Sequence, residues 1–329
     1  MTAGLRFSLV RLVAIGALVS AAIPGAFAAD PVDGRATVVM VAGAAGDPLY
    51  QPDIAQQAEA WQKASATAGA KFVVIGTVAA GGVADHDQLQ QALDAETKAG
   101  SGELWLVLAG HGTFDGKEAK LNLRGPDVSA SEMADWLKPF NRPIAIIDTT
   151  SASAPFLAKL AAPGRVIVTS TRSGYEQNYA RFGKYLAEAL PDPKSDLDKD
   201  GQISLLEAFL SASYRTAEFY KTEGRLATEH ALVDDNGDAL GTPFDWFRGV
   251  RAVKKAEDKA PLDGDRAHQF HLVRSTEEQH LTPERRSRRD ALELEISQLR
   301  ERKPKMSEDA YYRELETKLL ALAAIYQGT

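Results

Sequence analysis

Short apolar runs alternate with segments of helical spacing through the first two-thirds of the chain. The apolar runs are rich in β-branched residues and nearly unbroken, as is typical of strands covered on both faces. They occupy residues 37–41, 72–77, 104–109, 144–148 and 166–170. Between them, apolar positions follow helical spacing over residues 53–67, 87–98, 130–137 and 154–160. This alternation predicts an α/β fold with a mainly parallel sheet sandwiched by helices.

The pattern changes in the last third of the chain. Residues 191–245 are rich in Asp, Gly and Pro around one helical stretch, residues 204–220. After Thr282-Pro283 two further helical stretches follow, separated by Pro304, with Ser307 as a candidate N-cap of the second. We therefore expect an α/β domain over residues 29–250, a linker over 251–281 and a C-terminal helical hairpin over 282–329.

The first 28 residues have the features of a cleaved secretory signal peptide. Two arginines precede an apolar run, which is broken by Pro24-Gly25 and followed by the small-residue triplet 26–28. The Pro-Gly break argues against an uncleaved membrane anchor, because a spanning helix needs roughly 20 apolar residues. A periplasmic or secreted protein with no membrane span after signal removal is expected.

Composition narrows the possible partners and chemistry. The chain has 38 basic and 45 acidic residues, and removal of the leader with its two arginines leaves 36 against 45, a net charge of −9. A surface for nucleic acid is not expected at this charge. The cysteine count is zero, which excludes thiol catalysis and thiolate zinc sites.

Two of the predicted strands end in chemically useful residues. His111 lies between two glycines after the strand 104–109, and Thr150 and Ser151 follow Asp148 at the end of the strand 144–148. The carboxyl ends of parallel strands meet at one edge of the sheet, where functional groups gather. A histidine there is suited to proton transfer near neutral pH, although a histidine in a tight turn is more often structural.

These motifs resemble the caspase and legumain family of cysteine peptidases. The shared features are a strand ending in His-Gly and a later hydrophobic strand ending in an acidic residue, here Asp148, a small residue, here Thr149, and the nucleophile. The resemblance covers about residues 37–247 and implies a caspase-like fold in an exported bacterial protein. It also implies that Thr150 stands where the family has its catalytic cysteine. A threonine hydroxyl needs much stronger activation by a base than a thiol does.

Three functional hypotheses follow from this departure. The leading one is a non-catalytic pseudopeptidase that binds a peptide or protein partner in the cell envelope. The second is a hydrolase that uses a dyad of His111 with Thr150 or Ser151, although the sequence shows no third group to orient the histidine. The third is an envelope assembly protein that acts through its C-terminal helices.

Residues 196–207 fit the twelve-residue EF-hand loop that binds Ca²⁺. The expected ligands are Asp196, Asp198, Asp200, the carbonyl of Gln202, Ser204 and Glu207, with Gly201 permitting the sharp turn. The alternative is an acidic loop that only caps the following helix. Two prolines before the loop break any entering helix, so we expect a single structural site rather than a calcium sensor.

A second acidic segment, residues 234–238, contains the dipeptide Asn236-Gly237. This sequence is typical of a tight turn. We favour a plain turn there over a second metal site.

Overall fold

A seven-stranded sheet in the order β10-β9-β8-β7-β3-β1-β2 forms the centre of the protein. Its strands are β1 (Thr37–Ala42), β2 (Lys71–Ile75), β3 (Leu104–Ala109), β7 (Ile144–Asp148), β8 (Arg165–Thr169), β9 (Leu232–Asp234) and β10 (Thr242–Pro243). The first five run parallel to one another, β9 is antiparallel to β8, and β10 is antiparallel to β9. The predicted mainly parallel sheet is confirmed.

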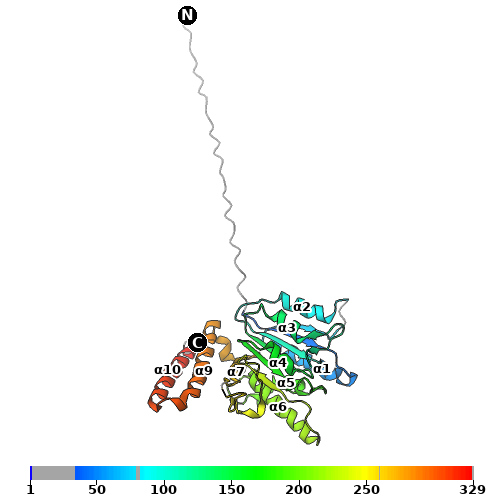
Figure 1. The fold of residues 1–329 in the computed structure, drawn as a ribbon. Helices are drawn as coiled ribbons and strands as arrows, with labels where there is room; N and C mark the ends of the chain where they lie inside the picture. The colour runs from blue at the N-terminus through cyan, green and yellow to red at the C-terminus, as the bar shows by residue number, and fades with distance from the viewer. Residues whose placement is uncertain (2–33, 79–81, 259, 328–329) are drawn as a thin grey trace. The chain divides into compact units, whose positions relative to one another are not determined.

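Helices cover both faces of this sheet (Figure 1). One face packs α1 (Gln51–Thr67), α5 (Phe182–Ala189) and α6 (Leu205–Thr222), and the other packs α2 (Asp85–Ala95), α3 (Ala130–Leu137) and α4 (Ala154–Leu160). Successive strand side chains alternate between the two cores: Val38 belongs to the first and Val39 to the second. This two-sided burial explains the unbroken apolar runs, because neither face of a central strand meets water.

The computed structural model describes Met1 and residues 34–78, 82–258 and 260–327. The predicted leader, residues 1–28, falls outside the described residues except for Met1. None of the described helices combines the length and apolar character needed to cross a membrane.

A small antiparallel sheet follows β3 and was not anticipated from the sequence. It consists of β4 (Gly112–Phe114), β5 (Ala119–Leu121) and β6 (Val128–Ser129). Its first strand begins one residue after His111, so the hairpin of β4 and β5 sets the direction in which the chain leaves the main sheet. A further pair, β11 (Phe247–Arg248) and β12 (Arg251–Ala252), lies near the end of the α/β part.

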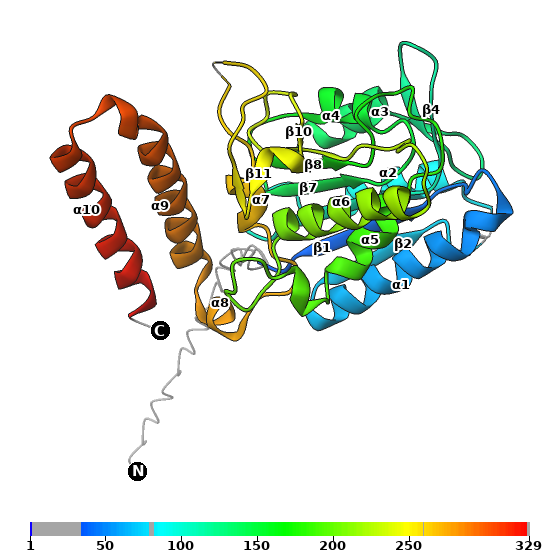
Figure 2. The ribbon, with the colours of Figure 1, turned by 90° about the horizontal axis from the view of Figure 1, so that it is seen from below.

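The described residues after β12 form the helices α7 (Asp265–Gln269), α8 (Thr276–His280), α9 (Pro283–Arg302) and α10 (Glu308–Tyr326). Short 3-10 turns occur at Pro48–Tyr50, Pro193–Ser195, Phe244–Trp246 and Lys303–Lys305. The two long helices form the expected antiparallel hairpin (Figure 2), and Ser307 caps α10 by accepting a hydrogen bond from the amide of Ala310. The segment expected as a linker inserts Phe270 and Leu272 into the core, with 4% and 5% of their surfaces exposed.

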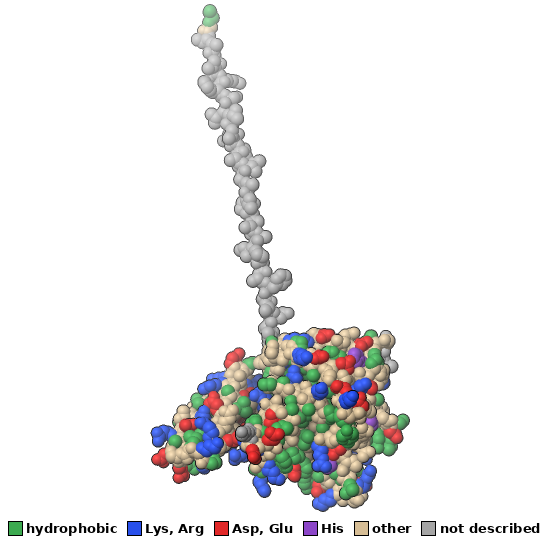
Figure 3. Space-filling view, viewed as in Figure 1, with side chains coloured by type: hydrophobic (Ala, Val, Ile, Leu, Met, Phe, Trp, Pro, Cys, Tyr) green, Lys and Arg blue, Asp and Glu red, His purple; other side chains and the backbone are tan. Residues whose placement is uncertain are grey.

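Basic and acidic side chains are interspersed on the face shown in Figure 3. Ion pairs join the two helices of the hairpin, with Lys318 and Glu295 at 2.5 Å and Arg302 and Glu314 at 3.3 Å. The side chains of Arg302 and Glu314 are 56% and 48% exposed, whereas that of Arg289 is buried, with 5% exposed.

Candidate functional site

The end of β3 and the end of β7 meet at the carboxyl edge of the sheet. Leu108 pairs with Asp148 in the parallel register, and the amide of Gly112 donates to the hydroxyl of Ser151 at 3.1 Å. The approach is so close that a Cβ atom on Gly112 would lie 2.2 Å from the carbonyl oxygen of Ser151, so only glycine fits. The structure therefore brings the two sequence motifs to one edge.

The two candidate nucleophiles point into the protein. Thr150 has none of its surface exposed, and its hydroxyl donates to Oδ1 of Asp148 at 2.6 Å. Ser151 is 1% exposed and its hydroxyl donates to the carbonyl of Gly112 at 3.1 Å. Within the described residues, no hydrogen bond joins either hydroxyl to the ring of His111. The geometry lacks the contact between nucleophile and base that a hydroxyl dyad needs.

His111 itself is oriented by a residue that the sequence did not reveal. Its Nδ1 lies 3.3 Å from Oδ1 of Asn122, whose amide nitrogen donates to Asp127 at 3.0 Å and to Thr113 at 3.3 Å. The amide nitrogen of Asn122 faces Asp127, so the amide oxygen of Asn122 faces the His111 ring. An amide oxygen can only accept a hydrogen bond, so the Nδ1 atom of His111 carries the proton. Asn122 is therefore the third group that orients His111, and no periodic or motif signal marks it.

A loop crosses over the turn that carries Thr150. The carbonyl of Glu176 accepts from the amide of Ala152 at 2.8 Å, and the side chain of Gln177 donates to the carbonyl of Phe114 at 3.2 Å. Tyr175 packs its ring edge-on against Phe114, with 5.4 Å between centroids. These contacts hold residues 175–177 against the turn that carries Thr150 and against β4.

Asp148 is the most unusual acid at this edge. Its Oδ1 accepts from the amide and hydroxyl of Thr150, whereas its Oδ2 is buried without a hydrogen-bond partner among the described residues. Complete burial raises the pKa of this carboxyl from 3.8 to about 7, because the charged form loses its hydration. A buried carboxyl of this kind weakens the fold whenever it is ionised.

The acidic loop 196–207 gathers three of its predicted ligands. Carboxylate oxygens of Asp196, Asp198 and Asp200 all lie within 4.8 Å of one another. Asp196 accepts from the amide of Lys199 at 2.7 Å and from that of Gly201 at 3.3 Å, which curls the chain around the carboxylates. Gly201 adopts a positive φ of 86°, which glycine accommodates without strain.

The remaining predicted ligands close the loop onto α6. The carboxylate of Glu207 accepts from the amide and hydroxyl of Ser204, both at 2.8 Å, in a capping box at the start of the helix. Its other oxygen accepts from the amide of Leu197 at 2.7 Å. The side chain of Gln202 accepts from the amide of Ser275 at 3.1 Å and donates to Oδ2 of Asp200 at 3.0 Å, so it links the acidic cluster to the segment that carries Ser275.

A histidine from outside the loop also reaches this cluster. Nε2 of His268, on α7, lies 3.0 Å from Oδ2 of Asp198. Ligand atoms of His268, Asp198 and Glu207 lie within 4.8 Å of one another. Sequence reasoning missed His268 because 70 residues separate it from its partner in the chain.

The second acidic segment forms a turn with the same local bonding as the first loop. Asp234 accepts from the amides of Gly237 and Ala239, both at 2.8 Å, as Asp196 does from the third and fifth residues after it. Burial raises the pKa of Asp234, and the nearby Asp238 and Asp235 raise it further.

Three cavities of the described part lie away from His111. The largest, about 820 Å³, runs between α1, the end of α5 and the acidic loop, where Gly201, Gln202 and Ile203 line it. A second, about 450 Å³, lies between α6 and residues 243–246. A third, about 540 Å³, lies beside α9. None of these three is lined by His111 or Thr150.

Asp148→Asn tests the charge at the buried edge. The folded pKa of about 7 lies above the unfolded value of 3.8, so the acid's contribution to stability is complete below about pH 4 and is lost as pH rises through 7. The variant has no such carboxyl and should not lose this stability. The difference in the free energy of unfolding, variant minus wild type, should therefore increase with pH by up to about 4 kcal/mol. Urea unfolding at pH 4.5 and pH 8 measures this, and the exposed Asp94→Asn should behave as wild type. An equal difference at both pH values would contradict the assignment.

Comparison with known proteins gives weak likenesses. No protein-family model and no curated protein match the sequence. Among solved structures, the chain resembles the initiator caspase Dronc of Drosophila at 12% identity and a TM-score of 0.40, over 64% of this chain and 84% of that one. It also resembles caspase-1 of Spodoptera frugiperda at 12% identity and a TM-score of 0.39, over 61% and 86%. A third structure, the Geobacter sulfurreducens protein GSU0716, has 11% identity and a TM-score of 0.39, over 55% and 89%. At these values the likeness transfers no residue role to this chain.

Proposed function

We propose that this chain is a calcium-binding, caspase-like pseudopeptidase of the cell envelope that binds a peptide or protein partner without cleaving it. The observation that carries the calcium part is the convergence of Asp196, Asp198 and Asp200 within 4.8 Å. Ca²⁺ prefers six to eight oxygen ligands, which carboxylates and backbone carbonyls of such a loop supply. Three adjacent carboxylates repel one another, and a cation between them relieves that cost.

The residues around this cluster favour a bound ion of modest affinity. Backbone amides already satisfy part of each carboxylate, as with Asp196, so the loop holds its shape through its own hydrogen bonds. The ion therefore adds stability to a formed loop rather than folding it. Export to a compartment with abundant calcium, as the leader sequence predicts, suits a site of millimolar class.

The non-catalytic part rests on the carboxyl edge of the sheet. The hydroxyls of Thr150 and Ser151 are buried and bonded to Asp148 and Gly112, and the loop through Glu176 covers the turn that carries them. A nucleophilic hydroxyl must be exposed to the substrate and must lie within hydrogen-bond distance of a base. The hydroxyls of Thr150 and Ser151 are buried, and neither is hydrogen-bonded to His111 among the described residues.

A second function, assembly through the C-terminal helices, is favoured by one observation. The outer side of α10 leaves Tyr312, Leu319 and Leu320 with 49%, 46% and 65% of their surfaces exposed. Large apolar side chains grouped on one helix are typical of a contact surface. We propose that a second copy of this chain covers them.

Calcium at about 5 mM should stabilise the wild-type protein by about 1–2 kcal/mol for a dissociation constant of 0.1–1 mM. In a thermal melt this corresponds to roughly 2–4 °C for each kcal/mol. Glu207→Gln should abolish the shift, because it removes a ligand charge while keeping an oxygen for the capping box.

Glu132→Gln is the matched control for this measurement. Glu132 occupies the same position in the capping box of α3, where it bonds Ser129, and it lies outside the acidic loop. The variant should lower the basal melting temperature but keep the calcium shift. A wild-type melting temperature that does not change with calcium would remove the basis for the proposed site.

Incubation with a diverse peptide library, with and without calcium, tests for catalysis. We expect no turnover above the uncatalysed background, because neither candidate hydroxyl contacts His111. Mass spectrometry of the peptides provides the measurement. Reproducible cleavage that disappears in His111→Ala would show that the protein is a hydrolase.

The double variant Leu319→Lys/Leu320→Lys tests assembly. Light scattering after size-exclusion chromatography should give a dimer for the wild type and a monomer for the variant, since two buried charges oppose the contact. Leu49→Lys, at a residue that is 75% exposed and distant in sequence, should stay dimeric. A monomeric wild type at tens of micromolar would refute assembly through this surface.

A further inference from the structure

The acidic loop is tied to a segment that the EF-hand pattern does not include. We call residues 263–281 the strap; they contain α7 and α8. Strap and loop meet in three hydrogen bonds: His268 Nε2 with Asp198 Oδ2 at 3.0 Å, the Ser275 amide to Gln202 Oε1 at 3.1 Å, and the Leu205 amide to the Phe270 carbonyl at 2.8 Å. One of these bonds holds a carboxylate of the acidic cluster itself.

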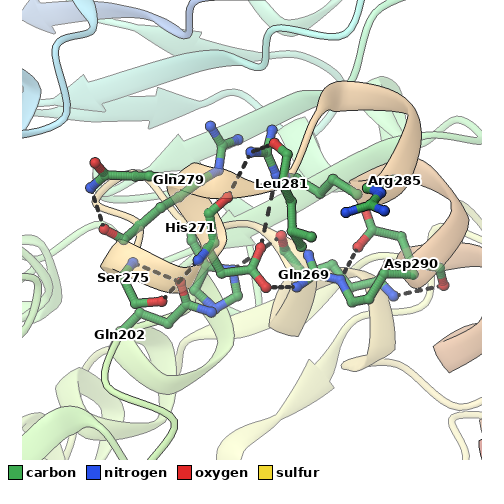
Figure 4. A network of polar contacts seen from close by, with 12 residues as sticks. Gln202, Gln269, His271, Ser275, Gln279, Leu281, Arg285 and Asp290 are labelled. Atoms are coloured by element: carbon green, nitrogen blue, oxygen red, sulfur yellow. Dashed lines mark hydrogen bonds and ion pairs between the residues drawn. The ribbon is translucent and has the colours of Figure 1, made fainter. Parts of the chain in front are cut away.

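The same strap holds the first helix of the C-terminal hairpin (Figure 4). Gln269 donates to the carbonyl of Asp290 at 2.9 Å and to the carboxylate of Glu293 at 3.0 Å. Glu278 forms a short ion pair with Arg289, and these two side chains are 6% and 5% exposed. The strap therefore contacts the loop on one side and α9 on the other.

The strap is anchored in the core of the protein. Phe270 and Leu272 are buried in the core, and Phe270 packs edge-on against Trp105 of β3 at 5.8 Å between centroids. His271 is 5% exposed, and burial lowers the pKa of its ring to about 3, so it is neutral. Removing one partner from the buried pair of Glu278 and Arg289 would leave an uncompensated charge, which opposes sliding of the strap along α9.

The bond from His268 fixes how Asp198 presents its charge. Oδ1 of Asp198 accepts from the amide of Asp200 at 3.3 Å, and Oδ2 meets His268. Without the histidine, repulsion from Asp196 and Asp200 favours rotation of this carboxylate away from the cluster. His268 is thus placed to act as a positioning residue for the cation site, since partners behind a ligand set its orientation and affinity.

We propose that the cation site extends beyond the loop to His268, so that ion binding by the loop and docking of the strap and α9 are coupled. This inference rests on the proposed calcium binding. Coupling between two sites is reciprocal, so an ion that favours the aligned Asp198 also favours the docked strap, and a docked strap raises the affinity for the ion by the same factor.

Titration calorimetry with Ca²⁺ tests the positioning role. His268→Ala should weaken calcium binding about 10-fold or more, as loss of a partner behind a metal ligand commonly does. His268→Gln should restore most of the affinity, because its amide nitrogen can still donate to Asp198. His280→Ala, at an exposed histidine of the same strap, should leave the affinity unchanged.

Hydrogen exchange tests the coupling to the strap. Calcium should slow exchange at the Ser275 amide and at the start of α9 in the wild type. Gln202→Ala removes the acceptor of the Ser275 amide and also a hydrogen bond from its side chain to Asp200. At a calcium concentration that saturates the variant, it should therefore lose the calcium-dependent protection at Ser275. Gln279→Ala, which removes only a bond to the carbonyl of Arg274, is the control and should retain that protection.

The outcomes separate the two proposals. If the wild type binds no calcium, the proposed function fails, and the coupling fails with it. If the wild type binds calcium, but His268→Ala binds equally well and strap exchange does not respond, the coupling alone is overturned.

Discussion

The pairing of β3 with β7 is the constraint on which the carboxyl edge of the protein depends. Both strands are covered on both faces, so a one-residue slip would move every side chain to the opposite core. The register that pairs Leu108 with Asp148 therefore fixes where each strand leaves the sheet. His111 and Thr150 arrive at the same edge as a consequence, and the backbone of Gly112 is pressed against Ser151.

The close contact between Gly112 and Ser151 determines which hydrogen bonds the polar groups at this edge form. In so tight a contact, the hydroxyls of Thr150 and Ser151 satisfy neighbouring acceptors that burial would otherwise leave unpaired. Within the part of the chain that the structure describes, one oxygen of Asp148 has no hydrogen-bond partner, which is costly for an ionised group. The edge is therefore organised by internal hydrogen bonding.

Much of the fold was predictable because burial on two faces leaves a strong pattern. The helices expected over residues 130–137 and 154–160 coincide with α3 and α4, whereas the helix expected over 87–98 ends at Ala95. It ends there because Glu96 takes an extended conformation and pairs with Lys71 and Arg142. The spacing of the acidic loop likewise placed Asp196, Asp198 and Asp200 together. Asn122 and His268 could not be found in this way, since tertiary folding brings them to partners 11 and 70 residues away.

The contacts of Glu207 are short in sequence, and this affects the order in which parts of the chain fold. Its contacts with Ser204 and Leu197 span 3 and 10 residues, whereas the pairing of β3 with β7 joins Leu104 to Ile144, 40 residues apart. Closing a short segment loses less chain entropy than closing a long one, and local contacts form faster. We therefore expect the loop and the first turn of α6 to form a local nucleus, with the acidic cluster in place before the central strands have found one another.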